Sequence, residues 1–288
     1  MTIFWHRHIF YYITVFVGLI SLLTNCSSTR FIYTFIDEFI KDEITYFLDL
    51  DEEKKVLLNQ QVSEMVNWHR KYILPKYANY LSNMADKLEA NKYGPFDINE
   101  FLEDGKSLIE ETVTGLTPYA SKFLIKNQNF ESIEFMEKRM LKRRQERIIE
   151  LSKPEDILYE KRLERLIINF ERFFGNLEDS QIILVEAHAR ITLNESRVRL
   201  HNRTLRQKNF IRFLRTQPTE VELTNYLNKL LLNGHTITNP SYKNFSEISL
   251  QRFHALLVNI LAISSTMQRE KIIKKLRDYA ADFKAVSM

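Results

Sequence analysis

The chain has 288 residues, of which 44% are hydrophobic and 27% are charged, and this is enough for one large domain or two smaller ones with a sizeable core. Only 6 glycines and 6 prolines occur, so a sheet architecture with frequent tight turns is excluded. The formal net charge is +4, and the single cysteine, Cys26, excludes both an intramolecular disulfide and a zinc site made of several thiolates.

The chain begins with a segment typical of an exported protein. Residues 1–10 are basic with no acidic residue, and residues 9–23 form an uncharged apolar stretch of 15 residues, shorter than a spanning helix needs. The sequence Leu23-Thr24-Asn25-Cys26 follows, and it resembles the bacterial lipobox. That resemblance implies that residues 1–25 are a cleaved signal peptide and that lipid on Cys26 anchors the protein in a membrane.

Two residues next to Cys26 bear on this interpretation. Asn25 stands where the lipobox usually has a smaller residue, and the alternative is an uncleaved membrane helix with an incidental cysteine. An aspartate directly after the lipobox cysteine would resemble an inner-membrane retention signal, but this chain has Ser27 at that position. We therefore expect a periplasm-facing protein of the cell envelope, in the outer membrane rather than the inner one.

The rest of the chain predicts a series of helices, because apolar residues recur at spacings of three and four. The expected helices cover residues 31–48, 52–91, 97–113, a short segment ending at 126, 130–151, 152–174, 178–215, 219–233, 246–263 and 266–286. Pro75 predicts a kink at residues 72–74, and Gly115 with Pro118 predicts a break between two helices. Capping boxes are predicted to begin with Ser152 and Thr219.

These elements predict an all-α fold with seven to nine helices, arranged as a bundle or an elongated array. After the signal peptide at 1–25, we expect an acidic helical region over 26–126 and a basic and C-terminal region over 127–288, packed as one unit. Residues 26–137 carry a net charge of −8 and residues 138–215 one of +8. Either the two parts pack together or are solvated, or the basic part meets lipid headgroups or an acidic protein. Nucleic acid is not an expected partner of an exported protein.

The most conspicuous polar cluster is Trp68-His69-Arg70, with Asp37 as a carboxylate that could approach it. A histidine between an arginine and a carboxylate can serve as a general acid or base. The favoured alternative is a structural histidine at a helix interface, with Trp68 in the core. No catalytic residue, metal site or cofactor is predicted, because no nucleophile, metal-ligand spacing or phosphate loop accompanies the cluster.

Several short motifs together resemble one known family. They are Cys26-Ser27-Ser28, Tyr33, Asp37, Asp42, Tyr46-Phe47-Leu48-Asp49-Leu50, Trp68-His69-Arg70 and Leu74-Pro75-Lys76-Tyr77-Ala78, with looser matches at 151–175 and 268–283. The chain is similar to lipoproteins of Gram-negative proteobacteria that are catalogued only as a domain of unknown function. The resemblance implies a location and an architecture but no activity.

A weaker likeness concerns two helix starts. Residues 177–181, which end in Gln181, and residues 263–268, which end in Gln268, are similar to the Leu-Thr-x-x-Gln helix starts of small periplasmic stress chaperones. The simpler interpretation is two ordinary N-caps.

The sequence therefore predicts a lipid-anchored envelope protein that acts as a periplasmic binding or scaffold protein with an envelope protein as partner; its oligomeric state is left open. One alternative is a chaperone-like or stress adaptor, which should expose an apolar groove. The other is an envelope enzyme that uses Trp68-His69-Arg70, which should gather His69, Arg70 and carboxylates in a pocket.

Overall fold

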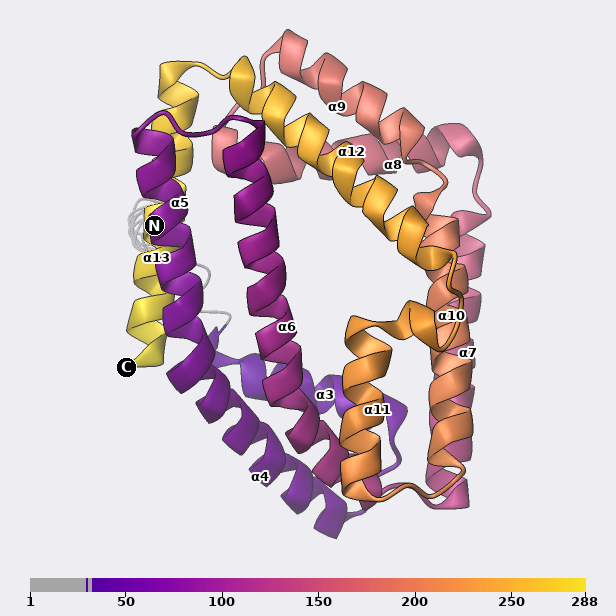
Figure 1. The fold of residues 1–288 in the computed structure, drawn as a ribbon. Coiled ribbons are helices and arrows are strands. Elements are labelled where there is room, and N and C mark those ends of the chain that lie inside the picture. The colour runs from indigo at the N-terminus through magenta and orange to yellow at the C-terminus, as the bar shows by residue number, and fades with distance from the viewer. Residues whose placement is uncertain (1–29, 31–32) are drawn as a thin grey trace, which may run out of the picture.

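The computed structural model describes residue 30 and residues 33–288, and every regular element in this part is a helix (Figure 1). The predicted all-α class is confirmed. The predicted signal peptide at 1–25 and the predicted lipobox with Cys26 lie outside the described residues. Within the described part, no helix has both the length and the apolar character that crossing a membrane requires.

The helices follow one another with short connections. They are α3 (Ile36–Phe47), α4 (Glu52–Trp68), a π-helical turn (His69–Ile73), α5 (Leu74–Glu89), α6 (Pro95–Ile125), α7 (Phe130–Leu151), α8 (Glu155–Phe174), α9 (Asp179–Ile191), α10 (Glu195–Leu214), α11 (Glu220–Leu232), a 3-10 turn (Gly234–Thr236), α12 (Tyr242–Ala262) and α13 (Thr266–Ser287). If α4, the π turn and α5 count as one bent rod, the described part has ten helices, slightly more than the expected seven to nine.

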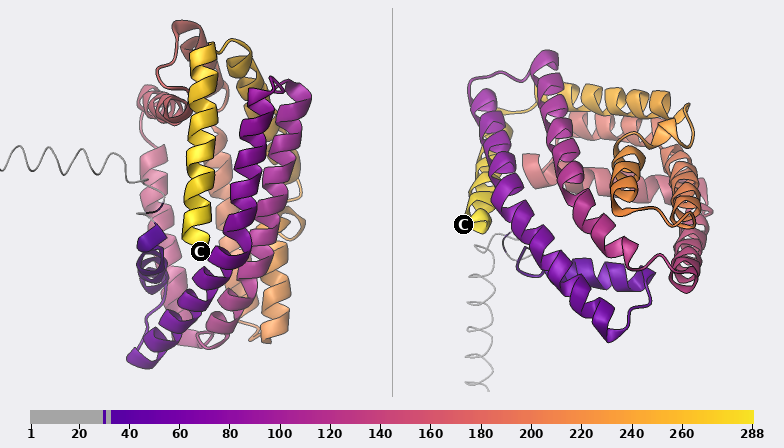
Figure 2. Two further views of the ribbon diagram at one scale, coloured as in Figure 1. Left: turned by 90° about the vertical axis from the view of Figure 1, so that its left-hand side faces the viewer. Right: turned by 60° about the horizontal axis from the view of Figure 1, so that its bottom comes forward.

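The long helix α6 packs against α4, α5, α11 and α12. Helices α5 and α13 pack side by side at one edge of the molecule, and α7 and α10 pack together at the opposite edge (Figures 1 and 2). Helices α3 and α4 close one end, while α8, α9 and α12 close the other. Helix α11 packs against α6 between the two edges.

Two separate hydrophobic cores lie at the two ends. The first gathers α3, α4, α7, α10, α11 and the C-terminal part of α6 around buried residues such as Leu58, Leu214 and Leu223. The second gathers α5, α8, α9, α12, α13 and the N-terminal part of α6 around residues such as Val185 and Ile260. Each fully buried side chain of this kind contributes roughly 1.5–3 kcal/mol. Helix α6 spans both cores, so it couples the two ends.

The predicted kink before Pro75 is present as the π turn. Proline has no N–H to donate, and its ring would collide with the carbonyl four residues earlier. The chain responds by widening one turn, and the Leu74 N–H donates to the His69 carbonyl, five residues back. Turns of this kind inside α-helices are frequent at functional sites.

The predicted break at Gly115 and Pro118 is wrong, because α6 continues through both residues. Proline at 118 leaves the Thr114 carbonyl without its usual helical donor, and the Thr117 hydroxyl donates to that carbonyl at 3.0 Å. Gly115 lies directly under the ring of Trp68, and a β-carbon there would overlap that ring. The glycine is therefore a packing notch and not a helix end.

Two further helix boundaries differ from the prediction. Ser152 follows α7 and donates to the Ile148 carbonyl at 2.8 Å, so the predicted capping box at Ser152 is wrong. The predicted helix 178–215 is interrupted at the buried Thr192, whose hydroxyl donates to the His188 carbonyl at 2.6 Å and accepts from the Arg162 guanidinium at 2.8 Å. The capping box at Thr219 is confirmed, as the Thr219 N–H donates to the Glu222 carboxylate at 2.8 Å.

Candidate functional site

The π turn brings two of the predicted site residues against the first described segment of the chain. The Tyr33 hydroxyl and His69 Nδ1 share a short hydrogen bond, and the two rings stack with 6.0 Å between centroids. Arg70 donates to the Tyr33 carbonyl at 3.2 Å, and its guanidinium lies 5.4 Å from the centre of the Tyr33 ring. The hydroxyl of Tyr33 is therefore held by His69, and its carbonyl and ring are held by Arg70.

Asp37 completes this group from the start of α3, whereas Trp68 does not take part in it. Burial raises the pKa of Tyr33 to about 12, Arg70 opposes that rise and Asp37 adds to it, which places both charges near the phenol. One carboxylate oxygen of Asp37 is buried without a hydrogen bond. The Trp68 ring instead lies against Tyr119 of α6, with 6.4 Å between ring centroids. The members of the predicted cluster thus have different neighbours, since Trp68 contacts α6 while His69 and Arg70 contact Tyr33.

A contact with the last helix extends the group. Arg30 Nε donates to the Asp282 carboxylate at 2.8 Å, and the Asp282 side chain is almost fully buried. We call Arg30, Tyr33, His69, Arg70 and Asp282 the N-terminal clasp. It joins Tyr33 to the π turn and Arg30 to α13, whose C-terminal end lies at the left edge of Figure 1.

The electrostatics of the clasp suit a hydrogen bond between two neutral side chains. Burial lowers the pKa of His69 below 6.5, so its ring is neutral at pH 7 and can accept the hydrogen bond from Tyr33. The Tyr77 ring also lies close to His69, with 6.3 Å between centroids. Across residues 30 and 33–288, no group of three or more His, Cys, Asp or Glu side chains is arranged to hold a metal ion.

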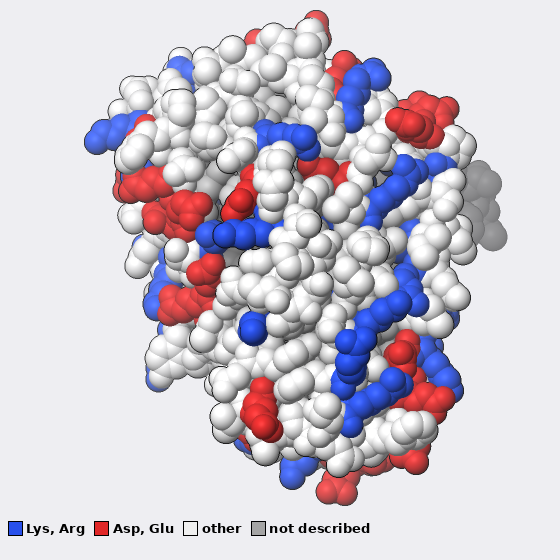
Figure 3. Space-filling view, turned by 45° about the vertical axis from the view of Figure 1, so that its right-hand side comes forward, with Lys and Arg blue, Asp and Glu red and all other residues white. Residues whose placement is uncertain are grey.

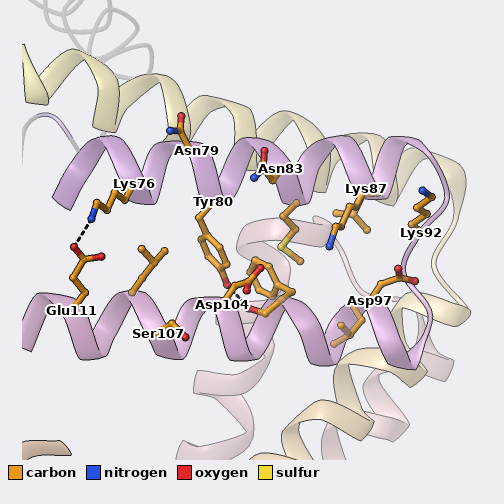
Figure 4. Close-up of a pocket in the computed structure, with 15 residues that line it drawn as sticks. Lys76, Asn79, Tyr80, Asn83, Lys87, Lys92, Asp97, Asp104, Ser107 and Glu111 are labelled. Atoms are coloured by element: carbon orange, nitrogen blue, oxygen red, sulfur yellow. Dashed lines mark hydrogen bonds and ion pairs between the residues drawn. The ribbon is translucent and has the colours of Figure 1, made fainter. Parts of the chain in front are cut away.

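A polar groove of about 410 Å³ lies between α5 and the first half of α6 (Figure 4). Tyr80 occupies its middle, donating to the Phe101 carbonyl at 3.0 Å and stacking on the Phe101 ring. Burial, together with Asp104, raises the pKa of Tyr80. Lys76 and Glu111 form an ion pair at one end of the groove.

Sequence reasoning missed this groove. Its charged residues of both signs recur at helical spacing, as they do on an ordinary solvated helix face. Its lining charges are Lys76, Lys87, Lys92, Asp97, Asp104 and Glu111. Three cations and three carboxylates balance, so the groove has no net charge that would select a charged ligand.

The predicted basic middle part meets the acidic first part at one place and is exposed at another. Arg143 of α7 forms a two-fold ion pair with Glu43 of α3, and the longer of its two hydrogen bonds is 2.9 Å. Helix α10 continues the basic surface, and Lys and Arg side chains follow the edge that α7 and α10 form (Figure 3). A cavity of about 270 Å³ lies between these two helices. The ion pair agrees with the interpretation that the two parts pack together, and an anionic partner for the exposed basic surface stays a prediction.

The two helix starts that end in Gln181 and Gln268 lie against each other, which the sequence did not indicate. The buried amides exchange two hydrogen bonds of 3.0 and 2.9 Å. Each glutamine also accepts from the backbone N–H of its own N-cap residue, Glu178 or Ser265. The two helix starts are ordinary N-terminal caps, as the simpler interpretation held, with Glu178 and Ser265 as the N-cap residues, and the two glutamines also join α9 to α13.

Comparison with known proteins assigns the chain to a family but does not assign it an activity. No curated protein and no solved structure matches the chain. The sequence model of a family described only as a family of unknown function, DUF6279, matches residues 46–243. This range is more than half of the chain, and it contains the π turn, the α5–α6 groove and the α7–α10 edge. The chain therefore belongs to this family of unknown function.

Proposed function

We propose that the protein is a lipid-anchored component of the bacterial cell envelope, on the periplasmic side of the outer membrane, and that it acts as a binding or scaffold protein. The N-terminal clasp is the observation that carries this proposal. Its first residue, Arg30, comes only four residues after Cys26. Four residues span at most about 14 Å, so lipid on Cys26 would hold the helical body next to the membrane.

The clasp would also restrict how the helical body is oriented relative to an anchor on Cys26. A lipid on a free flexible segment would let the body rotate, whereas residues held at both Asp282 and His69 restrict its orientation. The protein would then present the same faces to its surroundings. A fixed orientation is useful to a protein whose work is binding.

Anchoring is tested by labelling cells with palmitate. The unchanged protein should incorporate label, and Cys26→Ser should abolish it and leave an unprocessed precursor. Ser28→Ala is the matched control and should be labelled normally. Continued labelling of Cys26→Ser would refute the lipid anchor.

The clasp needs its own test, because lipidation and orientation are separate claims. Arg30→Gln with Tyr33→Phe should keep the palmitate label while residues near 30 become more sensitive to limited proteolysis in membranes. Lys41→Gln, which removes a cation involved in an ion pair within α3 itself, is the control. Unchanged protease sensitivity would show that the clasp does not hold the segment.

The packing of the predicted cluster supports binding over catalysis. His69 packs against the rings of Tyr33 and Tyr77, and four cavities of the described part have linings that include neither His69 nor Arg70. An envelope enzyme that uses Trp68-His69-Arg70 is therefore the less supported alternative.

A chaperone-like adaptor is the second candidate, and two observations favour it. The helix starts that resemble those of periplasmic stress chaperones meet at Gln181 and Gln268. An almost wholly apolar cavity of about 280 Å³, lined by Phe47, Met65 and Met140 among others, opens between α3, α4, α6 and α7. The full chain in detergent should then suppress aggregation of a chemically unfolded test protein at equimolar ratio. Absence of suppression would remove this candidate and leave the scaffold.

A further inference from the structure

We infer that the groove between α7 and α10 binds an acidic amphipathic helix of another envelope protein. The inference rests on the proposed function for the compartment in which that partner is found. The groove is defined by the cavity between the two helices and by the exposed side chains that continue it toward the C-terminal end of α7.

The two helices form a groove with an apolar floor. They run antiparallel, because Arg197 donates to the Leu151 carbonyl at one end and Arg215 pairs with Glu137 at 2.6 Å at the other. The cavity of about 270 Å³ is lined in part by Met140, Leu141 and Ile211. Leu141, Ile148 and Val198 keep 39%, 48% and 40% of their surface exposed, so apolar area continues along the helices beyond the cavity.

The rims of this groove carry positive charge that the protein does not neutralise. Its two carboxylates are already engaged, Glu134 with Lys138 at 3.1 Å and Glu137 with Arg215. No carboxylate of the described residues forms an ion pair with Arg144 or Lys208, which both line the cavity. Figure 3 shows Lys and Arg side chains along this edge. An occupant that brings carboxylates to these two cations would complement them.

The shape of the groove favours a helix over a lipid surface. A third helix packs into the concave space between two helices at about 8–10 Å from each axis, whereas a bilayer surface is flat. Helix α7 rises about 21 Å between Glu134 and Ile148, which matches a partner of about four helical turns. Its apolar side chains at spacings of three and four would cover the floor, and flanking Asp or Glu would meet the rims.

The position of the groove also favours a protein partner over the membrane. Arg30 pairs with Asp282 of α13 at the edge formed by α5 and α13, and α7 with α10 form the opposite edge (Figures 1 and 2). Helices α7 and α10 are separated from that point by the width of the body. A membrane held close to Arg30 by lipid on Cys26 therefore leaves this groove accessible to a protein.

The test uses the full chain in nanodiscs of zwitterionic lipid and a fluorescent synthetic peptide with one leucine stripe flanked by glutamates. Anisotropy should show saturable binding that weakens with added salt. Arg144→Glu with Lys208→Glu should weaken binding about tenfold, because two exposed ion pairs are replaced by repulsion. Lys92→Glu with Lys284→Glu is the matched control; it makes the same charge change in the connection after α5 and on α13, and should alter binding less than twofold.

Several results would overturn the inference. They are absence of binding by the unchanged protein, equal binding of a scrambled peptide of the same composition, and equal weakening by the control pair. Loss of binding to phosphatidylglycerol vesicles in the double variant, with peptide binding intact, would assign the groove to a lipid surface. A dimer in sedimentation that the double variant loses would assign it to a second copy. Circular dichroism and thermal unfolding check that both double variants are folded.

The two proposals fail separately. Cys26→Ser protein in detergent that still binds the peptide, combined with unchanged palmitate labelling of that variant in cells, would refute the anchor and leave the groove. A labelled protein that does not bind the peptide would refute the groove and leave the anchor.

Discussion

Replacing Gly115 by alanine tests how the two long helical rods of the protein fit together. In α6 this glycine lies under the indole of Trp68, and an added β-carbon would overlap the ring atoms Cζ2 and Cη2. The indole is confined by Tyr72 on its own rod and by Tyr119 on α6, so it has little room to move aside. Gly115→Ala therefore overpacks the contact between α4 and α6.

The size of the effect follows from two opposing contributions. Overpacking a well-packed site costs about 1–3 kcal/mol, and because the added β-carbon overlaps two ring atoms at once we place this site in the upper part of that range, at about 2–3 kcal/mol. Alanine in place of glycine inside a helix returns about 1 kcal/mol. We expect a net loss of about 1–2 kcal/mol in the free energy of unfolding, with Tm lower by roughly 2–8 °C.

A double-mutant cycle identifies the cause. Phenylalanine lacks the ring atoms Cζ2 and Cη2, so Trp68→Phe should relieve the overlap with Ala at 115. Urea unfolding of the full chain in detergent, followed by circular dichroism, should give a coupling energy of at least about 1 kcal/mol between the two changes. Additive effects, or a Gly115→Ala protein as stable as the unchanged one, would refute this account of the glycine.

Three further predictions concern buried polar groups. Burial lowers the pKa of His69 and His188 below 6.5 in the folded protein. As the pH drops from 7.5 to 5.5, the unfolded chain therefore binds protons at these histidines more readily than the folded chain does, and the free energy of unfolding should fall. Urea midpoints measure this, and replacing both histidines by glutamine should reduce the loss; an equal loss would contradict the assignment. Although burial opposes it, hydrogen bonds and ion pairs hold the pKa of Glu195 below its usual value, and Glu195→Gln should cost about 1–3 kcal/mol in urea unfolding. Gln181→Leu and Gln268→Leu should each cost about 1–3 kcal/mol, yet less together than their sum, because each leaves the other amide without its partner; a strictly additive pair would contradict that contact.

The candidate site combines residues that a local sequence pattern indicates with contacts between residues that are far apart in the chain. The sequence singled out Asp37, His69 and Arg70, because a histidine beside an arginine with a carboxylate in reach is recognisable from residue types. It did not identify Asp282 as the partner of Arg30, since 252 residues separate them and no local pattern relates them. It also grouped Trp68 with its neighbours, although the Trp68 ring packs against Tyr119 and Gly115 of α6 and not against Tyr33.

The charge asymmetry shows a similar limit. Counting charges along the chain predicts a basic middle part, but the count cannot tell which cations are neutralised. The fold pairs Arg143 with Glu43, 100 residues away, and leaves Arg144 beside it without a carboxylate among the described residues. Adjacent residues on a helix point about 100° apart, so their surroundings differ completely.

The sequence by itself determined the helical class, the amphipathic faces, the cap at Thr219 and the distortion at Pro75, because each depends on the backbone chemistry of neighbouring residues. Only the tertiary structure decided that α6 passes through Gly115 and Pro118 unbroken. There the local preference of glycine and proline to end a helix is outweighed by the packing of Trp68 and the hydrogen bond from Thr117. The clasp and the open basic groove were likewise decided by contacts between segments that are distant in the chain.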